Sequence, residues 1–162
     1  MAPIRVLFIC RGNSARSPMA EGFLLRYGRN RFEVQSAGTA PEPMDPLAVD
    51  VMRRGGVDIS AHRPQDVAAL AGETYDFVIT LCDDARDACL TFGATGRLIH
   101  WRFEDPAAFI GSPEESRRAF MRVRDEIAGR IRLFAYAQTR HQDSMLREAS
   151  LNRALLETAV TT

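Results

Sequence analysis

The chain has 162 residues, of which 46% are hydrophobic and 26% charged, as expected of a single globular enzyme-sized domain. Its 21 basic residues are all arginines and balance 21 acidic residues, so no net charge favours nucleic acid or an acidic membrane surface. The absence of lysine excludes a P-loop lysine and a Schiff-base lysine. No segment is long enough to span a membrane, and the N-terminal apolar run lacks a cleavage signal, so we expect a cytoplasmic protein.

Strands and helices alternate along the first 136 residues. The predicted elements are, in chain order, a strand over 4–9, a helix over 18–27, a strand over 32–36, helices over about 45–54 and 63–70, strands over 75–81 and 97–101, and a helix from 112 to about 136. The strands are apolar runs, and the last helix repeats apolar residues at helical spacing. This alternation predicts an α/β fold of three layers, with a four-stranded parallel sheet and helices on both faces.

The last part of the chain is interpreted separately. Residues 1–136 are expected to form the domain, and residues 137–162 a C-terminal helical appendage. Asp143 or Ser144 is expected to cap a helix that runs to about Leu156, with a broad and imperfect apolar stripe. Because a marginal helix of this length needs a surface to pack on, we expect it to dock on its own domain or on a second chain.

The segment between the first strand and the first helix carries the strongest functional signal. Gly12 and Asn13 are residue types that tolerate left-handed backbone geometry. A loop of this kind can turn successive amide N–H groups inward and form an anion-binding nest. Ser17 as N-cap and Pro18 at the first helical position open the following helix, whose dipole adds positive potential. The loop therefore predicts an oxyanion site.

The side chains at the two ends of this loop predict its chemistry. Arg16 can hold two oxygens of a tetrahedral oxyanion as a bidentate fork. The same positive field favours the thiolate of Cys10, and the thiolate is the nucleophilic form. The residues expected to contact the oxyanion are Arg11, Gly12, Asn13, Ser14, Ala15, Arg16 and Ser17. The sequence thus describes a thiolate nucleophile beneath a bound oxyanion.

The remaining cysteines and histidines give no metal site. Three cysteines, Cys10, Cys82 and Cys89, cannot be fully paired, and in a reducing compartment they are expected to rest as thiols unless they have a redox or catalytic task. The three histidines are widely separated, and none has metal-ligand spacing with a cysteine or another histidine. No metal is therefore predicted.

With these residues the chain resembles the low-molecular-weight tyrosine phosphatase superfamily, and more closely its thioredoxin-coupled arsenate reductases. The pattern Cys-x5-Arg-Ser, between a strand and a Ser-Pro helix start, matches the phosphate loop of the family. The resemblance runs from about residue 4 to 134. Further landmarks that match are Ser36-Ala37-Gly38-Thr39, Gly56-Val57-Asp58-Ile59-Ser60 followed by His62, and Asp105-Pro106 after His100-Trp101. The resemblance implies a phosphatase-like fold and assigns Asp105 as general acid, although Asp105 could instead only begin a turn with Pro106.

Two features resemble the reductases more than the phosphatases. Cys82 and Cys89, with six residues between them, match a pair that relays electrons in the reductases, although either could be a buried core thiol. Ala107 follows Asp105-Pro106, where the phosphatases usually have tyrosines that stack on the substrate ring. Ala15 also stands where many of the phosphatases have a second loop cysteine.

Some positions depart from the reductase pattern. Arg11 replaces a residue that is often threonine and adds charge beside the site, while Leu90 follows Cys89 where proline is common. Some relatives bind potassium near the loop. Asn13, Glu21 and Ser36 match such a site, but Arg63 and Gln65 do not look like ligands, so potassium is not predicted.

The reductase resemblance implies a definite reaction. Cys10 attacks the arsenic of bound arsenate, Asp105 protonates the leaving oxygen, Cys82 attacks Cys10 to release arsenite, and Cys89 attacks Cys82. No cofactor is bound, and an external dithiol such as thioredoxin reduces the resulting disulfide. A phosphatase that hydrolyses phosphomonoesters through a phosphocysteine is the alternative and does not need Cys82 or Cys89. A third possibility, a catalytically silent oxyanion sensor, leaves Cys10 and Asp105 without a purpose.

Overall fold

The computed structural model describes residues 1–92 and 95–159 of the chain. At its centre is a four-stranded sheet in which neighbouring strands are parallel. The strands are β1 (Ile4–Cys10), β2 (Phe32–Gly38), β3 (Thr74–Thr80) and β4 (Thr95–His100), in the order β2-β1-β3-β4. β1 is therefore an inner strand, and it ends at Cys10 with its last five residues buried.

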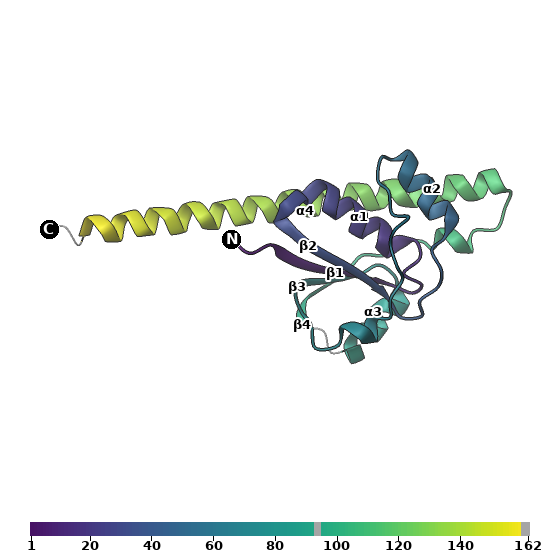
Figure 1. The fold of residues 1–162 in the computed structure, drawn as a ribbon, viewed down its shortest axis with the longest axis horizontal. Coiled ribbons are helices and arrows are strands. Elements are labelled where there is room, and N and C mark those ends of the chain that lie inside the picture. The colour runs from purple at the N-terminus through teal and green to yellow at the C-terminus, as the bar shows by residue number, and fades with distance from the viewer. Residues whose placement is uncertain (93–94, 160–162) are drawn as a thin grey trace.

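Helices lie on both sides of this sheet, as the alternation of elements predicts. They are α1 (Arg16–Gly28), α2 (Pro46–Arg54), α3 (Asp83–Phe92) and α4 (Pro113–Ala159). Single turns of 3-10 helix lie at Arg29–Arg31, Val67–Leu70 and Pro106–Ala108. α1 and α2 pack against α4, whereas α3 packs against β1 and β3 at the other side of the sheet (Figure 1). The expected three-layer α/β fold is confirmed.

Aromatic side chains join the longest helix to the sheet. Phe134 of α4 lies with its ring centroid 5.2 Å from that of Phe77 on β3 and 6.1 Å from that of Phe32 at the start of β2. Trp101, which follows β4, lies 5.6 Å from the same ring. Burying aromatic rings against one another contributes more than their area alone, so this cluster holds α4 across three strands.

Several predicted boundaries differ from the structure. The helix predicted over 63–70 is wrong except for its last turn, because residues 63–66 run alongside the end of β2. There, Gly38 N donates to Gln65 O at 2.9 Å. Helix α3 was not predicted, and β4 begins two residues before the predicted strand and ends one residue earlier.

The C-terminal segment is the largest departure. α4 is one helix of 47 residues, so the predicted separate helix capped at Asp143 or Ser144 is wrong. Arg31 binds its middle part, with Nε 2.8 Å from Gln142 Oε1 and Nη2 2.6 Å from Asp143 Oδ1. Beyond that point α4 projects away from the sheet (Figure 1), with Met145, Leu146 and Leu151 exposed. Across the described ranges, no helix is long and apolar enough to cross a membrane.

Removing residues 144–162 is expected to leave the reactivity of Cys10 unchanged, because the contacts of Arg31 with α4 end at Asp143. The measurement is the rate at which a thiol reagent modifies Cys10, followed by peptide mass spectrometry, beside the sedimentation behaviour of both proteins. A matched deletion from residue 139, which also removes Gln142 and Asp143, is expected to lower the melting temperature. A folded 1–143 protein with altered Cys10 reactivity would contradict this expectation.

Candidate active site

The segment between β1 and α1 wraps around the sulfur of Cys10. Cys10 is 2% exposed, and its Sγ lies 2.9 Å from Ser17 Oγ and 3.2 Å from the backbone N of Asn13, which donates to it. α1 begins at Arg16 with Ala15 as its N-cap and with no side-chain cap. The predicted capping role of Ser17 is therefore wrong: its hydroxyl lies in the first turn and faces the sulfur instead.

Asn13 sets the direction of these hydrogen bonds. Its backbone has a φ of 50°, a left-handed geometry that asparagine tolerates better than most residues; Gly12, also expected there, does not share it. Asn13 Nδ2 donates to Ser17 Oγ at 2.8 Å and to Ser36 Oγ at 3.0 Å. Because Ser17 accepts from Asn13, its own hydrogen is free to point at Cys10 and stabilise a thiolate.

Partly buried polar residues, His62, Gln65 and Glu21, support Asn13 from behind. Asn13 Oδ1 accepts from Gln65 N at 3.0 Å and lies 3.1 Å from His62 Nε2. His62 Nδ1 lies 3.4 Å from Glu21 Oε2, which also accepts from the hydroxyl of Ser36. Burial raises the pKa of Glu21 and lowers the pKa of His62, so each carries less charge than it would in water. Oδ1 of Asn13 and Oε2 of Glu21 thus accept from protein donors. The described residues contain no group of three or more His, Cys, Asp or Glu side chains that could hold a metal ion.

The backbone of residues 39–45 fixes the loop from outside. Thr39 N donates to Cys10 O at 3.1 Å, Ala40 N to Arg11 O at 2.8 Å and Glu42 N to Gly12 O at 2.9 Å. Because these carbonyls are turned toward the neighbouring segment, amides of the loop can face the opposite side, where an anion would bind. Gly38 allows this approach, since a Cβ at that position would lie 2.5 Å from Arg11 O and 2.9 Å from Asn13 N.

Gly38→Ala is therefore expected to displace the loop and to lower oxyanion binding and turnover by about a hundredfold, the cost of displacing reacting groups by about 1 Å. Phosphate binding by calorimetry and initial rates provide the measurement. Gly129→Ala is the matched control, because nothing lies within 4 Å of a Cβ at that position of α4 and its backbone is helical. Unchanged phosphate binding by the Gly38 variant would contradict the proposed close approach.

Arg16 and Asp105 meet at the open side of the loop. The Arg16 side chain is 9% exposed, and its Nη1 donates to Phe103 O at 3.2 Å. Its Nη2 lies 3.6 Å from Asp105 Oδ2. Asp105 also begins the turn Pro106–Ala108, with Oδ1 accepting from Ala107 N at 3.0 Å. Asp105 thus begins the turn and also places its half-exposed carboxyl beside Arg16.

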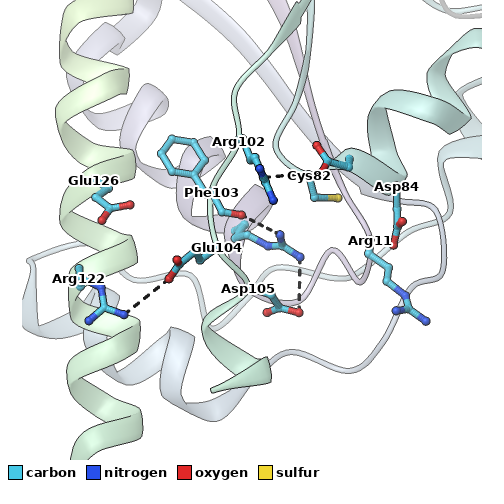
Figure 2. Close-up of a pocket in the computed structure, with 11 residues that line it drawn as sticks. Arg11, Cys82, Asp84, Arg102, Phe103, Glu104, Asp105, Arg122 and Glu126 are labelled. Atoms are coloured by element: carbon cyan, nitrogen blue, oxygen red, sulfur yellow. Dashed lines mark hydrogen bonds and ion pairs between the residues drawn. The ribbon is translucent and has the colours of Figure 1, made fainter. Parts of the chain in front are cut away.

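A pocket of about 670 Å³ opens above this pair (Figure 2). Arg11 and Asp84 lie at one end, and Arg122 and Glu126 project into it from α4 at the other. The residues that line it are Arg11, Arg16, Cys82, Asp83, Asp84, Arg102, Phe103, Glu104, Asp105, Arg122 and Glu126. Its walls are mainly charged, and Phe103 is their one aromatic residue. This lining offers little apolar surface on which an aryl group could pack.

The structure brings one of the two remaining cysteines to this pocket. Cys82 is 8% exposed at the start of α3, and its carbonyl accepts the first helical hydrogen bond from Arg86 N. Burial raises the pKa of the Cys82 thiol, while the amide of Ala85 and the charge of Arg16 oppose this shift. Cys10 is close enough to raise the same pKa through its charge.

Cys89 is separated from this group. It lies in α3, where burial raises the pKa of its thiol, and it lines a different, mostly apolar pocket with Leu98, Ile99 and His100. All three cysteines are free thiols. Cys10, Arg16, Asp105 and Cys82 are thus gathered at one site, whereas Cys89 is held apart by α3.

Sequence reasoning did not identify every residue of this site. His62 and Gln65 were not expected to support the loop, and the carbonyl of Phe103 was not expected to hold Arg16. The family landmark that precedes His62 was the available signal, but the interactions of all three residues join segments far apart in the chain.

Comparison with known proteins identifies the family of this chain. Residues 5–145 match the model of the low molecular weight phosphotyrosine protein phosphatases. The chain is 44% identical over 130 residues to an arsenate reductase from Shouchella clausii (strain KSM-K16), covering 80% of this chain and 94% of that protein. A solved arsenate reductase in its oxidized state superposes with a TM-score of 0.71 at 27% identity, over 82% of this chain and 97% of that one. A solved arsenate reductase in the phosphate binding state superposes with a TM-score of 0.63 at 25% identity, over 83% of this chain and 98% of that one. The chain belongs to the low molecular weight phosphotyrosine protein phosphatase family.

Proposed function

We propose that this protein reduces arsenate to arsenite, using Cys10 as nucleophile and Cys82 and Cys89 as an internal electron relay. One observation carries the proposal: Cys82 lines the same pocket as Arg16 and Asp105, and it is near enough to Cys10 for the charge of Cys10 to raise the pKa of the Cys82 thiol. A phosphatase needs no second thiol at that place. The resemblance to curated arsenate reductases over most of both chains supports the same reaction.

The first step uses the loop at the end of β1. Arsenate is bound by loop amides of residues 11–16 and by the guanidinium of Arg16, which exchanges its contact with Asp105 for the oxyanion. The Cys10 thiolate attacks arsenic and forms an S–As bond. Protonated Asp105 donates to the oxygen on the far side, which leaves as water.

The second step transfers the electrons. The Cys82 thiolate attacks the Cys10 sulfur and forms an S–S bond, while the electron pair of the S–As bond stays on arsenic, which leaves as arsenite. The Cys89 thiolate then attacks the Cys82 sulfur and releases Cys10 as a thiolate. Two thiols have become one Cys82–Cys89 disulfide, and arsenic has gained two electrons.

This relay requires α3 to change shape. Residues 82 and 89 are seven positions apart along a helical segment, which corresponds to about 10 Å of rise. A disulfide needs its two Cα atoms within about 7 Å. At least part of α3 must therefore unwind before Cys89 can reach Cys82. The exposed side chains of α3, including Asp84, Arg86 and Asp87, make this unwinding less costly than disruption of a core helix.

An external dithiol completes the cycle. The Cys82–Cys89 disulfide is reduced by thiol exchange, in which a thiolate of the donor attacks one of its sulfurs and a mixed disulfide forms. A thioredoxin-like protein is the donor that we propose, because it supplies both thiols in one molecule. No cofactor is bound in this scheme.

Replacing Asp105 by asparagine is expected to slow the first chemical step by about two to four orders of magnitude, the usual contribution of a general acid. Affinity for inhibitory phosphate is expected to remain, because Arg16 and the loop bind it. Single-turnover rates and phosphate inhibition measure the two effects separately. Glu104→Gln is the matched control, since Glu104 lines the same pocket and pairs with Arg122 at 3.8 Å. A larger loss in the Glu104 variant than in the Asp105 variant would reassign the acid.

Phosphomonoester hydrolysis is the second activity that the site supports. Phosphate and arsenate share shape and charge, and the first step needs only Cys10, Arg16 and Asp105. Water then replaces Cys82 as the group that resolves the adduct, at phosphorus instead of at sulfur. The charged pocket lining argues against large aryl substrates being preferred.

The test of this proposal is arsenate-dependent NADPH oxidation in the presence of thioredoxin and thioredoxin reductase, run beside hydrolysis of an aryl phosphate. We expect arsenate-dependent turnover with arsenite as product. A parallel reaction with dithiothreitol separates the identity of the reductant from the reaction itself. Robust aryl-phosphate hydrolysis with no arsenite formed under either reductant would establish the phosphatase alternative.

A further inference from the structure

The first turn of α3 is tied to the sheet by a polar contact. Asp83 Oδ1 lies 3.2 Å from Nε2 of His100, the last residue of β4. Arg102 Nε lies 3.7 Å from the other carboxylate oxygen, but the Arg102 side chain is 79% exposed whereas that of His100 is 25% exposed. His100 is therefore the more buried of these two partners of Asp83.

A second hydrogen bond fixes the imidazole. His100 Nδ1 lies 2.8 Å from Thr80 Oγ1, and Thr80 is buried at the end of β3. The Thr80 hydroxyl also donates to Ile99 O at 3.5 Å. The carboxyl ends of β3 and β4 thus hold the imidazole against the start of α3.

Few other contacts hold this helix. Ala85 is fully buried, but Asp84, Arg86 and Asp87 are exposed and Cys89 is only partly buried. The contact between His100 and Asp83 therefore lies where α3 begins, at the residue that follows Cys82. It is broken or weakened if the first turn unwinds.

We propose that His100 and Asp83 form a positioning pair that keeps α3 wound while Cys82 and Cys89 are thiols, and so sets their reduction potential. This rests on the relay proposed above. The pair acts on one exchange. The Cys89 thiolate attacks the Cys82 sulfur of the Cys10–Cys82 disulfide, that S–S bond breaks, and Cys10 leaves as a thiolate. Because the contact stabilises only the wound dithiol form, it favours reduction of the disulfide by the external donor.

The test is the thiol–disulfide equilibrium of Cys82 and Cys89 in full-length Cys10→Ser protein. Oxidised dithiothreitol accepts two electrons from the dithiol and becomes reduced dithiothreitol, so the ratio of its two forms defines the potential. Asp83→Ala is expected to raise the oxidised-to-reduced ratio of the protein about tenfold at a given potential, a shift of about 30 mV to more negative values. Alkylation and intact mass give the two populations.

Asp84→Ala is the matched control. This substitution also removes an acidic charge from the first turn of α3, where such a charge interacts favourably with the helix dipole. It leaves the contact between Asp83 and His100 in place. His100→Ala is the partner variant, with circular dichroism to verify folding, and its effect is expected not to add to that of Asp83→Ala in the double variant. Asp83→Gly is not suitable, because glycine alters helix propensity as well.

The outcomes separate the two proposals. The positioning pair is supported if Asp83→Ala raises the oxidised-to-reduced ratio tenfold more than Asp84→Ala does. The double variant must then show no larger ratio than Asp83→Ala or His100→Ala alone. Equal shifts for Asp83→Ala and Asp84→Ala, with a disulfide that forms normally, overturn the pair and leave the relay intact. If no Cys82–Cys89 disulfide forms at any potential in either protein, the relay itself fails, and the positioning pair fails with it.

Discussion

Cys10→Ser is expected to abolish arsenate reduction and aryl-phosphate hydrolysis together, by about a thousandfold or more. Both reactions begin with attack by the Cys10 sulfur, and a serine hydroxyl at the same place is a far weaker nucleophile. The fold is expected to persist, because serine is smaller than cysteine and Ser17 and Asn13 N can still bind its oxygen. Initial rates of both reactions measure the loss.

Phosphate binding by the Cys10→Ser protein is the control for this result. The loop amides and Arg16 remain, so calorimetry is expected to show phosphate affinity close to that of the unaltered protein. Substantial arsenate reduction by a variant that still binds phosphate would mean that another thiol, with Cys82 the nearest candidate, makes the first attack.

Cys82→Ser and Cys89→Ser are each expected to stop multiple-turnover arsenate reduction while preserving aryl-phosphate hydrolysis. The adduct at Cys10 forms without either residue, but only the relay converts it into arsenite and a reducible disulfide. The two variants are expected to stop at different points. Cys82→Ser retains the arsenic adduct, whereas Cys89→Ser accumulates a Cys10–Cys82 disulfide. Intact mass after one addition of arsenate distinguishes them.

The outcome that contradicts the relay is equally definite. If either variant turns over arsenate with thioredoxin at the rate of the unaltered protein, that cysteine is a core thiol and a different thiol couples to Cys10. A parallel loss of aryl-phosphate hydrolysis would instead indicate that the substitution damages the loop, since the relay has no part in hydrolysis.

The loop could be predicted from sequence because its signals are local. Cys10, Arg16 and the glycine and asparagine between them lie within seven consecutive residues, and a strand before and a helix after fix how that segment turns. The order of apolar runs and helical repeats likewise predicts the parallel sheet. These features depend on periodicity and spacing, which a single sequence displays directly.

The parts that were missed depend on the direction of single side chains or on contacts between distant segments. Ser17 looks like an N-cap from its neighbours, but Asn13 and Cys10 bind its hydroxyl. The close approach that requires Gly38 involves the backbone of Arg11 and Asn13, which no local pattern reveals.

The two helices that were misjudged have a different cause. α3 has only ten residues and four of its first five are charged, so no apolar run marks its beginning. α4 continues past the predicted break because residues 137–143 contain neither glycine nor proline; Asp143 therefore pairs with Arg31 instead of capping a new helix.

The central claim, that arsenate is reduced by this chain's own thiols, is tested most directly by a single turnover without any external reductant. Fully reduced protein is mixed with excess arsenate, arsenite is quantified, and the cysteines are mapped by alkylation and peptide mass spectrometry. We expect one arsenite for each Cys82–Cys89 disulfide formed, with Cys10 recovered as a thiol. Arsenite formation without that disulfide, or no arsenite from protein that hydrolyses aryl phosphates, would contradict the claim.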